Sequence, residues 1–384
     1  MIGYIIYVGS LLYYDKVGGK AFPIIGGVFD GISAGFLFVA SGSISTAYPE
    51  EKEKGSYITW NLNLQAGGSI IGTFIALVIN RDATKAAGVP LTVYIILMVL
   101  MGLAGLMSLT LIPPHKLRRK DGSQVVLRQS RGFLAELKTN LLIFTDWKLM
   151  LMVPAFLPAE CYLVYGGSTN AFQNNLRSRC LLSFCAVVLQ IPGGLGMQWL
   201  VDHRRWRRRT RVLAGLAYIG VPLMAAWIWE IVEARDFNRQ KPPPPQDWSD
   251  PGFVATFFRF MLQWVPSVLY HYYILVMLGT LTNDPTTLAH YSGVFRGFLG
   301  AGEAIAFGVD SVKVPYIIES GVSFCFYAIG LMVFAYLCLF QVEESRYFKE
   351  KNVVVPNHVV MEETVVGNPS KAQADSTENP ESTK

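Results

Sequence analysis

Four charged side chains stand inside long apolar stretches of the sequence, and their types and positions make them the first candidates for chemistry. They are Asp30, Glu160, Arg296 and Glu303. A charge at the centre of a bilayer costs about 2.5–3.5 kcal/mol on insertion scales, so such a group must face protein or water. Held in this way, these groups can bind a solute or pass a proton. The alternative interpretation is that they only hold helices together.

Spacing indicates which faces the two carboxylates in the first half of the sequence occupy. At 100° per residue, Asp30 shares a stripe of about 60° with three small or polar residues, Gly27, Ser41 and Ser45. That stripe is a close-packing face, so we expect Asp30 to be turned away from lipid. Glu160 follows Pro154 and Pro158, which loosen a helix beside its carboxylate.

Arg296 and Glu303 are seven residues apart and share a helix face. Their Cα atoms are then about 10.5 Å apart along the axis, so pairing with another helix is favoured over pairing with each other. His271 lies mid-span and can relay a proton near neutral pH, or it can be a packed, hydrogen-bonded core histidine. Arg259 and His290 stand close to span ends, where snorkelling to the interface is expected.

The elements that position these residues are membrane spans. Of 384 residues, 52% are apolar and 16% are charged, whereas soluble domains carry roughly 25% charged residues. The apolar residues form runs of about 20, the length that crosses the hydrocarbon core as a helix. The net charge of +5 comes from short basic clusters between these runs, which excludes a basic nucleic-acid-binding domain.

Ten spans are predicted, which makes the fold class all-α, a polytopic membrane helix bundle. Segments of about ten alternating residues, as in a membrane barrel, are not present in the pattern. The expected spans cover 1–14, 22–48, 59–80, 90–112, 149–168, 180–201, 212–231, 254–282, 287–309 and 316–341. The first is too short to cross a bilayer unaided.

Basic residues in the loops predict the orientation. The loops 49–57, 114–148 and 202–211 hold 16 Lys and Arg, whereas the loops of the opposite set hold 10, so the first set is expected in the cytoplasm. A surface helix is expected near Gly132 to Asn140. The prolines 242–245 predict a stiff spacer on the other side.

Four units follow from this layout. They are a partial N-terminal bundle at 1–112, a cytoplasmic linker at 113–148, a six-helix C-terminal bundle at 149–341 and a disordered cytoplasmic tail at 342–384. The tail is polar and rich in Ser, Thr, Asn, Pro and Glu, a composition that does not bury a core.

Two stretches carry a resemblance to a known family. The first runs from Gly27 to Asn61 and contains GVFDGISAG, SG, YP and KGSYITWN. The second runs from Thr282 to Asp310 and contains TNDP, YSG and GVD. They resemble the Unc-ninety-three-like family, fungal branch, of the major facilitator superfamily. Phe38 and Ser41 stand where many relatives have Trp and Gln.

The resemblance implies a major-facilitator-like fold, with about ten transmembrane segments in two bundles. It also implies that the first span here is the family's third, so that two family helices lie outside this sequence, as a truncated gene model would explain. The helices that hold Asp30 and Glu160 then correspond to cavity-lining ones. The run GMQWLVDHRRWRRR resembles a loop signature of the superfamily, in which Asp202, with Arg204 and Arg207, would form a conformational latch. The alternative is that these arginines only fix topology and meet anionic lipid.

Enzyme signatures such as a Walker loop, His-Glu-x-x-His or Gly-x-Ser-x-Gly are not found in the sequence, and neither is a paired-cysteine zinc pattern. We therefore expect an integral membrane protein that is not an enzyme and binds no cofactor or metal, in a plasma or internal membrane. The expected function is transport of an unknown small solute, with Asp30, Glu160, His271, Arg296 and Glu303 along the substrate or proton pathway. The alternative is a non-transporting regulator or trafficking partner of another membrane protein.

Overall fold

The computed structural model describes residues 2–50, 52–84, 89–111, 116, 132–203 and 205–345. Within these ranges the chain is helical and forms no sheet, which confirms the all-α prediction. Most of the linker before residue 132 and the tail from residue 346 lie outside the described residues. The expected disorder of the tail therefore stays a prediction.

Every predicted span corresponds to a helix of the structure. The N-terminal bundle holds α1 (Ile2–Val17), α2 (Ala21–Ala47), α3 (Lys54–Ile79) and α4 (Leu91–Ser108). The C-terminal bundle holds α6 (Trp147–Phe156), α7 (Cys161–Gln173), α8 (Leu176–Val201), α9 (Arg208–Ala234), α10 (Phe253–Leu281), α11 (Pro285–Ser311) and α12 (Tyr316–Phe340). Helices α6 and α7 together make one interrupted span.

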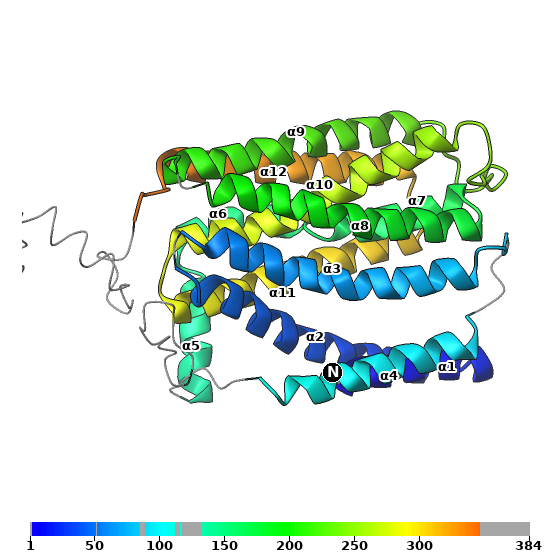
Figure 1. Ribbon diagram of the computed structural model, residues 1–384, viewed down its shortest axis with the longest axis horizontal. Helices are drawn as coiled ribbons and strands as arrows, with labels where there is room; N and C mark the ends of the chain where they lie inside the picture. Colours follow the sequence, from blue (N-terminus) through cyan, green and yellow to red (C-terminus); the bar gives the residue numbers. More distant parts are fainter. Residues whose placement is uncertain are drawn as a thin grey trace, which may run out of the picture.

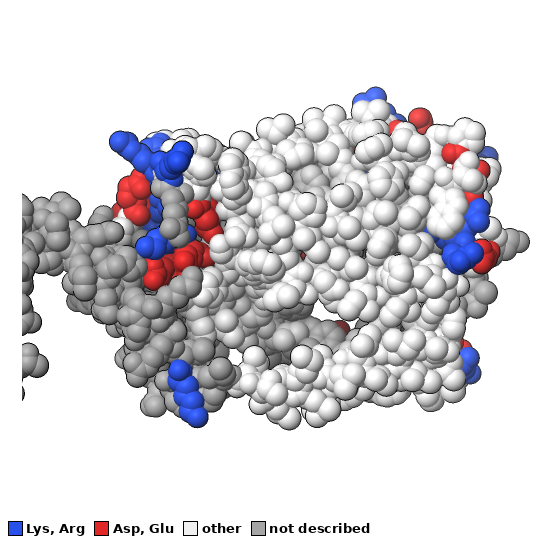
Figure 2. Space-filling view, viewed as in Figure 1, with Lys and Arg blue, Asp and Glu red and all other residues white. Residues whose placement is uncertain are grey.

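The surface of the molecule has the character of a membrane protein. Eight spans among the described residues are long and apolar enough to cross a bilayer. Outside that set, α1 has only 16 residues and α11 carries Arg296, Glu303 and Asp310. Figure 2 shows charged side chains at the two ends of this face and an uncharged surface between them. The uncharged band fits the hydrocarbon core of a membrane.

Two helix pairs join the bundles. Helix α3 packs along α8, and α2 packs along α11 (Figure 1). Helix α10 lies inside and is buried over most of its length. Figure 2 shows an opening between helices of the N-terminal bundle, with an acidic side chain in its depth.

The expected surface helix is α5 (Phe133–Ile143). It lies across the ends of the spans (Figure 1), and it exposes Leu134, Leu137 and Leu141 at helical spacing. The side chain of Asn140 reaches His290 Nδ1 at 2.5 Å, which ties α5 to the start of α11. An amphipathic helix in this orientation is placed to lie in the membrane interface.

The interruption between α6 and α7 follows from Pro158, because proline supplies no backbone N–H and its ring clashes with the preceding turn. Helix α6 ends at Phe156, and α7 begins at Cys161. Two buried tyrosines satisfy carbonyls that the break leaves free. Tyr270 donates to Ala155 O at 3.0 Å, and Tyr327 donates to Pro158 O at 2.8 Å. Non-helical backbone inside a membrane requires such protein partners.

On the opposite end, the connection between α9 and α10 is fixed to the start of α8. Arg177 donates two hydrogen bonds to Asp247, and Asn175 donates a third at 2.6 Å. The Arg177 guanidinium, with help from Ser249 and Asn175, holds the pKa of Asp247 well below its ordinary value. Asp247 therefore keeps its charge throughout the neutral range and anchors the proline-containing spacer.

Candidate functional site

The centre of the molecule contains a charged cluster built on the helix break. Glu160 is the N-cap residue of α7, so its carboxylate projects from non-helical backbone. Its Oε1 atom lies 3.1 Å from His271 Nδ1 on α10 and 3.6 Å from Arg296 Nη1 on α11. Three predicted site residues from three different spans therefore meet at one carboxylate.

Arg296 also reaches the other bundle. Its guanidinium lies 4.3 Å from the ring centroid of Phe38 on α2 and 5.4 Å from that of Phe295. Stacking of this kind attracts a cation to an aromatic face. The Arg296 side chain is only 10% exposed. It therefore joins Glu160 in the C-terminal bundle to α2 in the N-terminal bundle.

His271 is buried and has one ring nitrogen in use. Its Nδ1 atom contacts the Glu160 carboxylate. Its Nε2 atom is buried and has no hydrogen-bond partner among the described residues. A buried polar atom without a partner is costly, and such atoms concentrate where a ligand or proton binds. The imidazole can therefore accept or donate a proton at Nε2 while Glu160 fixes its orientation.

The other two pathway candidates lie near the cluster but do not join it. Asp30 is half-buried, and its Oδ1 atom has no hydrogen-bond partner among the described residues. Tyr4 lies within electrostatic reach of both Asp30 and Arg296. Glu303 lies within reach of Glu160 without forming an ion pair in the described part of the chain. Arg296 thus pairs across helices, as its seven-residue spacing from Glu303 predicts.

A second set of contacts joins the bundles at the end that carries α5. The Asp202 carboxylate accepts hydrogen bonds from the backbone N–H groups of Gly55, at 3.1 Å, and Ser56, at 2.6 Å. These are the first N–H groups of α3, which have no partner within the helix and carry its positive dipole end. Burial raises the pKa of Asp202, while the hydrogen bonds from Ser56 and Gly55 and the charge of Arg211 oppose the rise.

Of the two arginines assigned to this latch, only Arg207 lies among the described residues. Arg207 is the exposed N-cap residue of α9 and makes none of the contacts described between the bundles, and Arg204 lies outside the described residues. The donors that Asp202 is observed to use come from the N-terminus of α3, and the pairing with Arg207 stays a prediction.

Lys54 makes the reciprocal contact, and the sequence reasoning gave it no role. Its ammonium donates to Gly279 O and Asn283 Oδ1, each at 2.7 Å, and to Thr282 O at 3.2 Å. These groups end α10, where the helix dipole is negative. Lys54 is 7% exposed. The signal in the sequence was a lysine in the first turn of an apolar span, which needs a buried acceptor.

Replacing Asp202 by asparagine is expected to open this end of the molecule. Asparagine keeps one acceptor and loses one charged hydrogen bond, about 1.5 kcal/mol, so the open population rises about tenfold. The measurement is the rate of maleimide labelling of Ser56→Cys in a chain without its native cysteines. Labelling should accelerate in Asp202→Asn and stay unchanged in Arg207→Gln. Equal rates in both variants would show that Asp202 does not hold the bundles together.

The expectation that Arg259 snorkels to the membrane interface is wrong. This residue is 5% exposed and faces Glu230 on α9 inside the C-terminal bundle. Reasoning from the sequence missed Glu230, although a glutamate near the end of an apolar run is the same kind of signal as Glu160.

Among the residues that the structure describes, no group of three or more His, Cys, Asp or Glu side chains is placed to hold a metal ion.

Two helical bundles around a buried charged cluster define a multi-pass helical membrane protein. The fold is similar to the crystal structure of the fucose:proton symporter of E. coli, with a TM-score of 0.56 over 87% of this chain and 81% of that chain. The two sequences are 11% identical, so the likeness concerns the fold alone.

Sequence comparison is more specific. The chain is 28% identical to UNC93-like protein 1 of Arabidopsis thaliana, over 89% of this chain and 75% of that protein. It is also 28% identical to an uncharacterized membrane protein of Schizosaccharomyces pombe, over 84% of this chain and 67% of that protein. A notoamide biosynthesis cluster protein of Aspergillus versicolor is 27% identical over 87% of this chain. No family model matches. These relatives confirm the resemblance to UNC93-like proteins.

Proposed function

We propose that the protein moves a small solute across the membrane by rocking its two bundles around the Glu160–His271–Arg296 cluster. The observation that carries this proposal is a carboxylate shared by an imidazole and a guanidinium at a break in a membrane span. Discontinuous helices near the midplane are where transporters of this kind bind solutes and coupling ions.

Each member of the cluster has a role in this proposal. Glu160 and His271 exchange a proton, and the free Nε2 atom of His271 faces the solute. Arg296 is released from Glu160 when the carboxylate takes up a proton, because their attraction depends on the carboxylate charge. Its stacking on Phe38 transmits that change to the N-terminal bundle. Asp30 supplies the polar surface on the facing side.

The contacts of Asp202 and Lys54 stabilise the state of the transport cycle in which this end of the molecule is closed. Both are charges placed on helix ends of the opposite bundle, and both are made only while this end is closed. Opening the end breaks them, and the solute site then faces the other way.

Uptake into proteoliposomes tests the proposal. Radiolabelled sugars, amino acids, organic anions and organic cations are offered with an imposed pH gradient. We expect uptake of one class, with loss of about 100-fold or more in Glu160→Gln and Asp30→Asn, as for groups that act directly on the transported species. Asp250→Asn, in the loop before α10, is the matched control and should transport normally. Normal uptake in both site variants contradicts the proposal.

The same experiment distinguishes the regulatory alternative. A regulator would show no uptake of any class, would tolerate both substitutions, and would co-purify with another membrane protein in stoichiometric amounts.

A further inference from the structure

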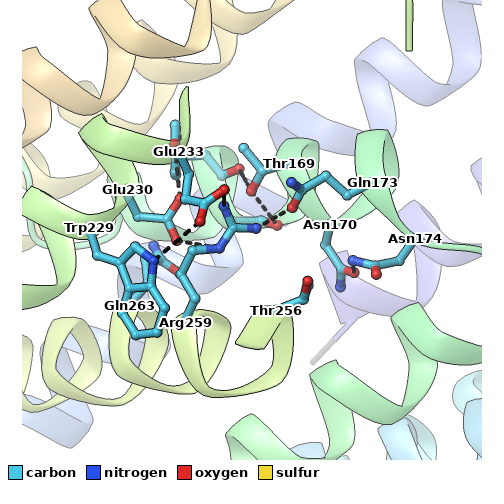
Figure 3. Close-up of polar contacts among 12 residues, drawn as sticks. Thr169, Asn170, Gln173, Asn174, Trp229, Glu230, Glu233, Thr256, Arg259 and Gln263 are labelled. Atoms are coloured by element: carbon cyan, nitrogen blue, oxygen red, sulfur yellow. Dashed lines mark hydrogen bonds and ion pairs between the residues drawn. The ribbon is translucent and has the colours of Figure 1, made fainter. Parts of the chain in front are cut away.

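A second buried charged cluster lies inside the C-terminal bundle, toward the end opposite α5. Figure 3 shows Arg259 of α10 between Glu230 and Glu233 of α9 on one side and Gln173 of α7 on the other. Arg259 Nη2 donates a short hydrogen bond to Gln173 Oε1. Nothing in the central site uses these residues.

The buried charges of this cluster are Glu230 and Arg259, because Glu233 is half-exposed. They compensate each other only loosely. The ion pairs are long: Arg259 Nε lies 3.7 Å from Glu230 Oε1, and Arg259 Nη1 lies 3.8 Å from Glu233 Oε2. Charge-assisted hydrogen bonds are about 2.7–2.9 Å. Arg259 Nη1 has no hydrogen-bond partner among the described residues. A buried carboxylate without a close charged partner favours the protonated form, so the site favours taking up one proton.

Glu230 is the carboxyl that holds this proton. It is 3% exposed, whereas the side chain of Glu233 is 46% exposed and can keep its charge in water. Tyr165 Oη lies 3.1 Å from Glu230 Oε2. A tyrosine hydroxyl donates to a carboxylate and accepts from a carboxylic acid, so this contact serves both protonation states.

The groups that act on Glu230 come from each neighbouring element. They are Arg259 on α10, Tyr165 on α7 and Glu233 on its own helix, α9. Helix α12 contributes Ser320, which acts on Tyr165. Gln263 on α10 has its Oε1 atom buried without a hydrogen-bond partner in the described part of the chain. Arg259 is thus the single cation among them.

Water has a route to the cluster. A pocket of about 540 Å³ lies beneath the connection between α9 and α10, and Gln173 and Phe237 are among its lining residues. Gln173 is the hydrogen-bond partner of Arg259, and the Phe237 ring centroid lies 5.5 Å from the guanidinium. The side chains of Gln173 and Phe237 therefore separate the cluster from the pocket, and the half-exposed carboxylate of Glu233 also reaches solvent.

We infer that Glu230, with Arg259, Tyr165 and Glu233, forms a proton-binding site that exchanges one proton with water in this pocket. Uptake converts the Glu230 carboxylate and a proton from water into a carboxylic acid that donates to Tyr165. Release restores the carboxylate and strengthens its attraction to Arg259. The assignment stands independently of solute transport, because it concerns a titration of the protein itself.

Infrared difference spectroscopy of the full chain in lipid tests the site. Lowering the pH should produce the carbonyl stretch of a buried protonated carboxylic acid. The part of that band due to Glu230 should be lost in Glu230→Gln and retained in Glu233→Gln and in Glu160→Gln. In Tyr165→Phe it should shift in frequency, because the acid loses its hydrogen-bond acceptor. A monodisperse elution profile in detergent checks that each variant is folded.

Two results would overturn the assignment. One is an infrared difference spectrum that is the same in the wild type and in folded Glu230→Gln, whether or not it contains the carboxylic acid band. The other is a signal that follows sodium concentration at constant pH, which would identify the ligand as a metal cation. Uptake measurements do not enter this test, so failure of the transport proposal leaves its outcome readable.

Discussion

Glu160→Gln should lower the free energy of unfolding by about 3 kcal/mol, because removing one partner of a buried ion pair leaves the other charge uncompensated. Glutamine has nearly the same shape and still accepts a hydrogen bond from His271, so the loss isolates the carboxylate charge. Arg296, 10% exposed, is the charge that is left behind. The measurement is the thermal unfolding midpoint in detergent, followed by tryptophan fluorescence.

A double-mutant cycle with Arg296→Gln provides the control. If the two residues act as a pair, the double variant is more stable than the sum of the single losses predicts, by about 1–3 kcal/mol. Asp250→Asn in the α9–α10 connection should leave the midpoint unchanged. Strictly additive losses would mean that Glu160 and Arg296 do not interact, and the site would lose its central contact.

Gly302→Ala should be comparably damaging, and for a steric reason. A Cβ atom at Gly302 would lie 2.0 Å from the backbone oxygen of Leu157, a distance that real Cβ atoms do not reach. Leu157 lies in the break between α6 and α7, where the backbone has few alternatives. Overpacking of this kind costs about 1–3 kcal/mol. We expect a clear drop in the thermal midpoint and a weakened Glu160–Arg296 contact, because α11 must move away from the break.

Gly300→Ala is the matched control two residues earlier on α11. Nothing lies within 4 Å of a Cβ atom built there. Alanine in a helix is favoured over glycine by up to about 1 kcal/mol, so this variant should be neutral or slightly more stable. Equal losses at both positions would show that the effect comes from the helix itself and not from its contact with Leu157.

Much of the fold is readable from the sequence, because crossing a membrane requires about 20 apolar residues in a row. Eight spans follow from that rule, and α5 follows from leucines at helical spacing. The rule does not locate the break at 157–160. Pro158 signals a disturbance, but the freed carbonyls accept hydrogen bonds from Tyr270 and Tyr327, which lie more than 100 residues away in the sequence.

The candidate site could be predicted in part from the sequence for a related reason. Glu160 and Arg296 are charges in apolar runs, so the cost of burial singles them out. Their partners depend on which helices are neighbours. Lys54 and Arg259 illustrate the limit, since both stand near span ends, where snorkelling is the ordinary outcome. Tertiary packing instead buries each one against acceptors on another helix.

We propose that the two bundles change their relative tilt around the Glu160 cluster. Electron spin resonance distance measurements in lipid test this directly, in a chain without its native cysteines. One label pair is Lys52→Cys with Arg205→Cys, at the end held by Asp202. The other is Arg81→Cys with Arg235→Cys, at the opposite end. All four positions are exposed, and each pair spans the two bundles.

We expect two distances for each pair, with opposite changes: Asp202→Asn lengthens the first distance and shortens the second. A single distance for each pair, unchanged by Asp202→Asn and by pH, would mean that the bundles form one rigid body and would contradict the account.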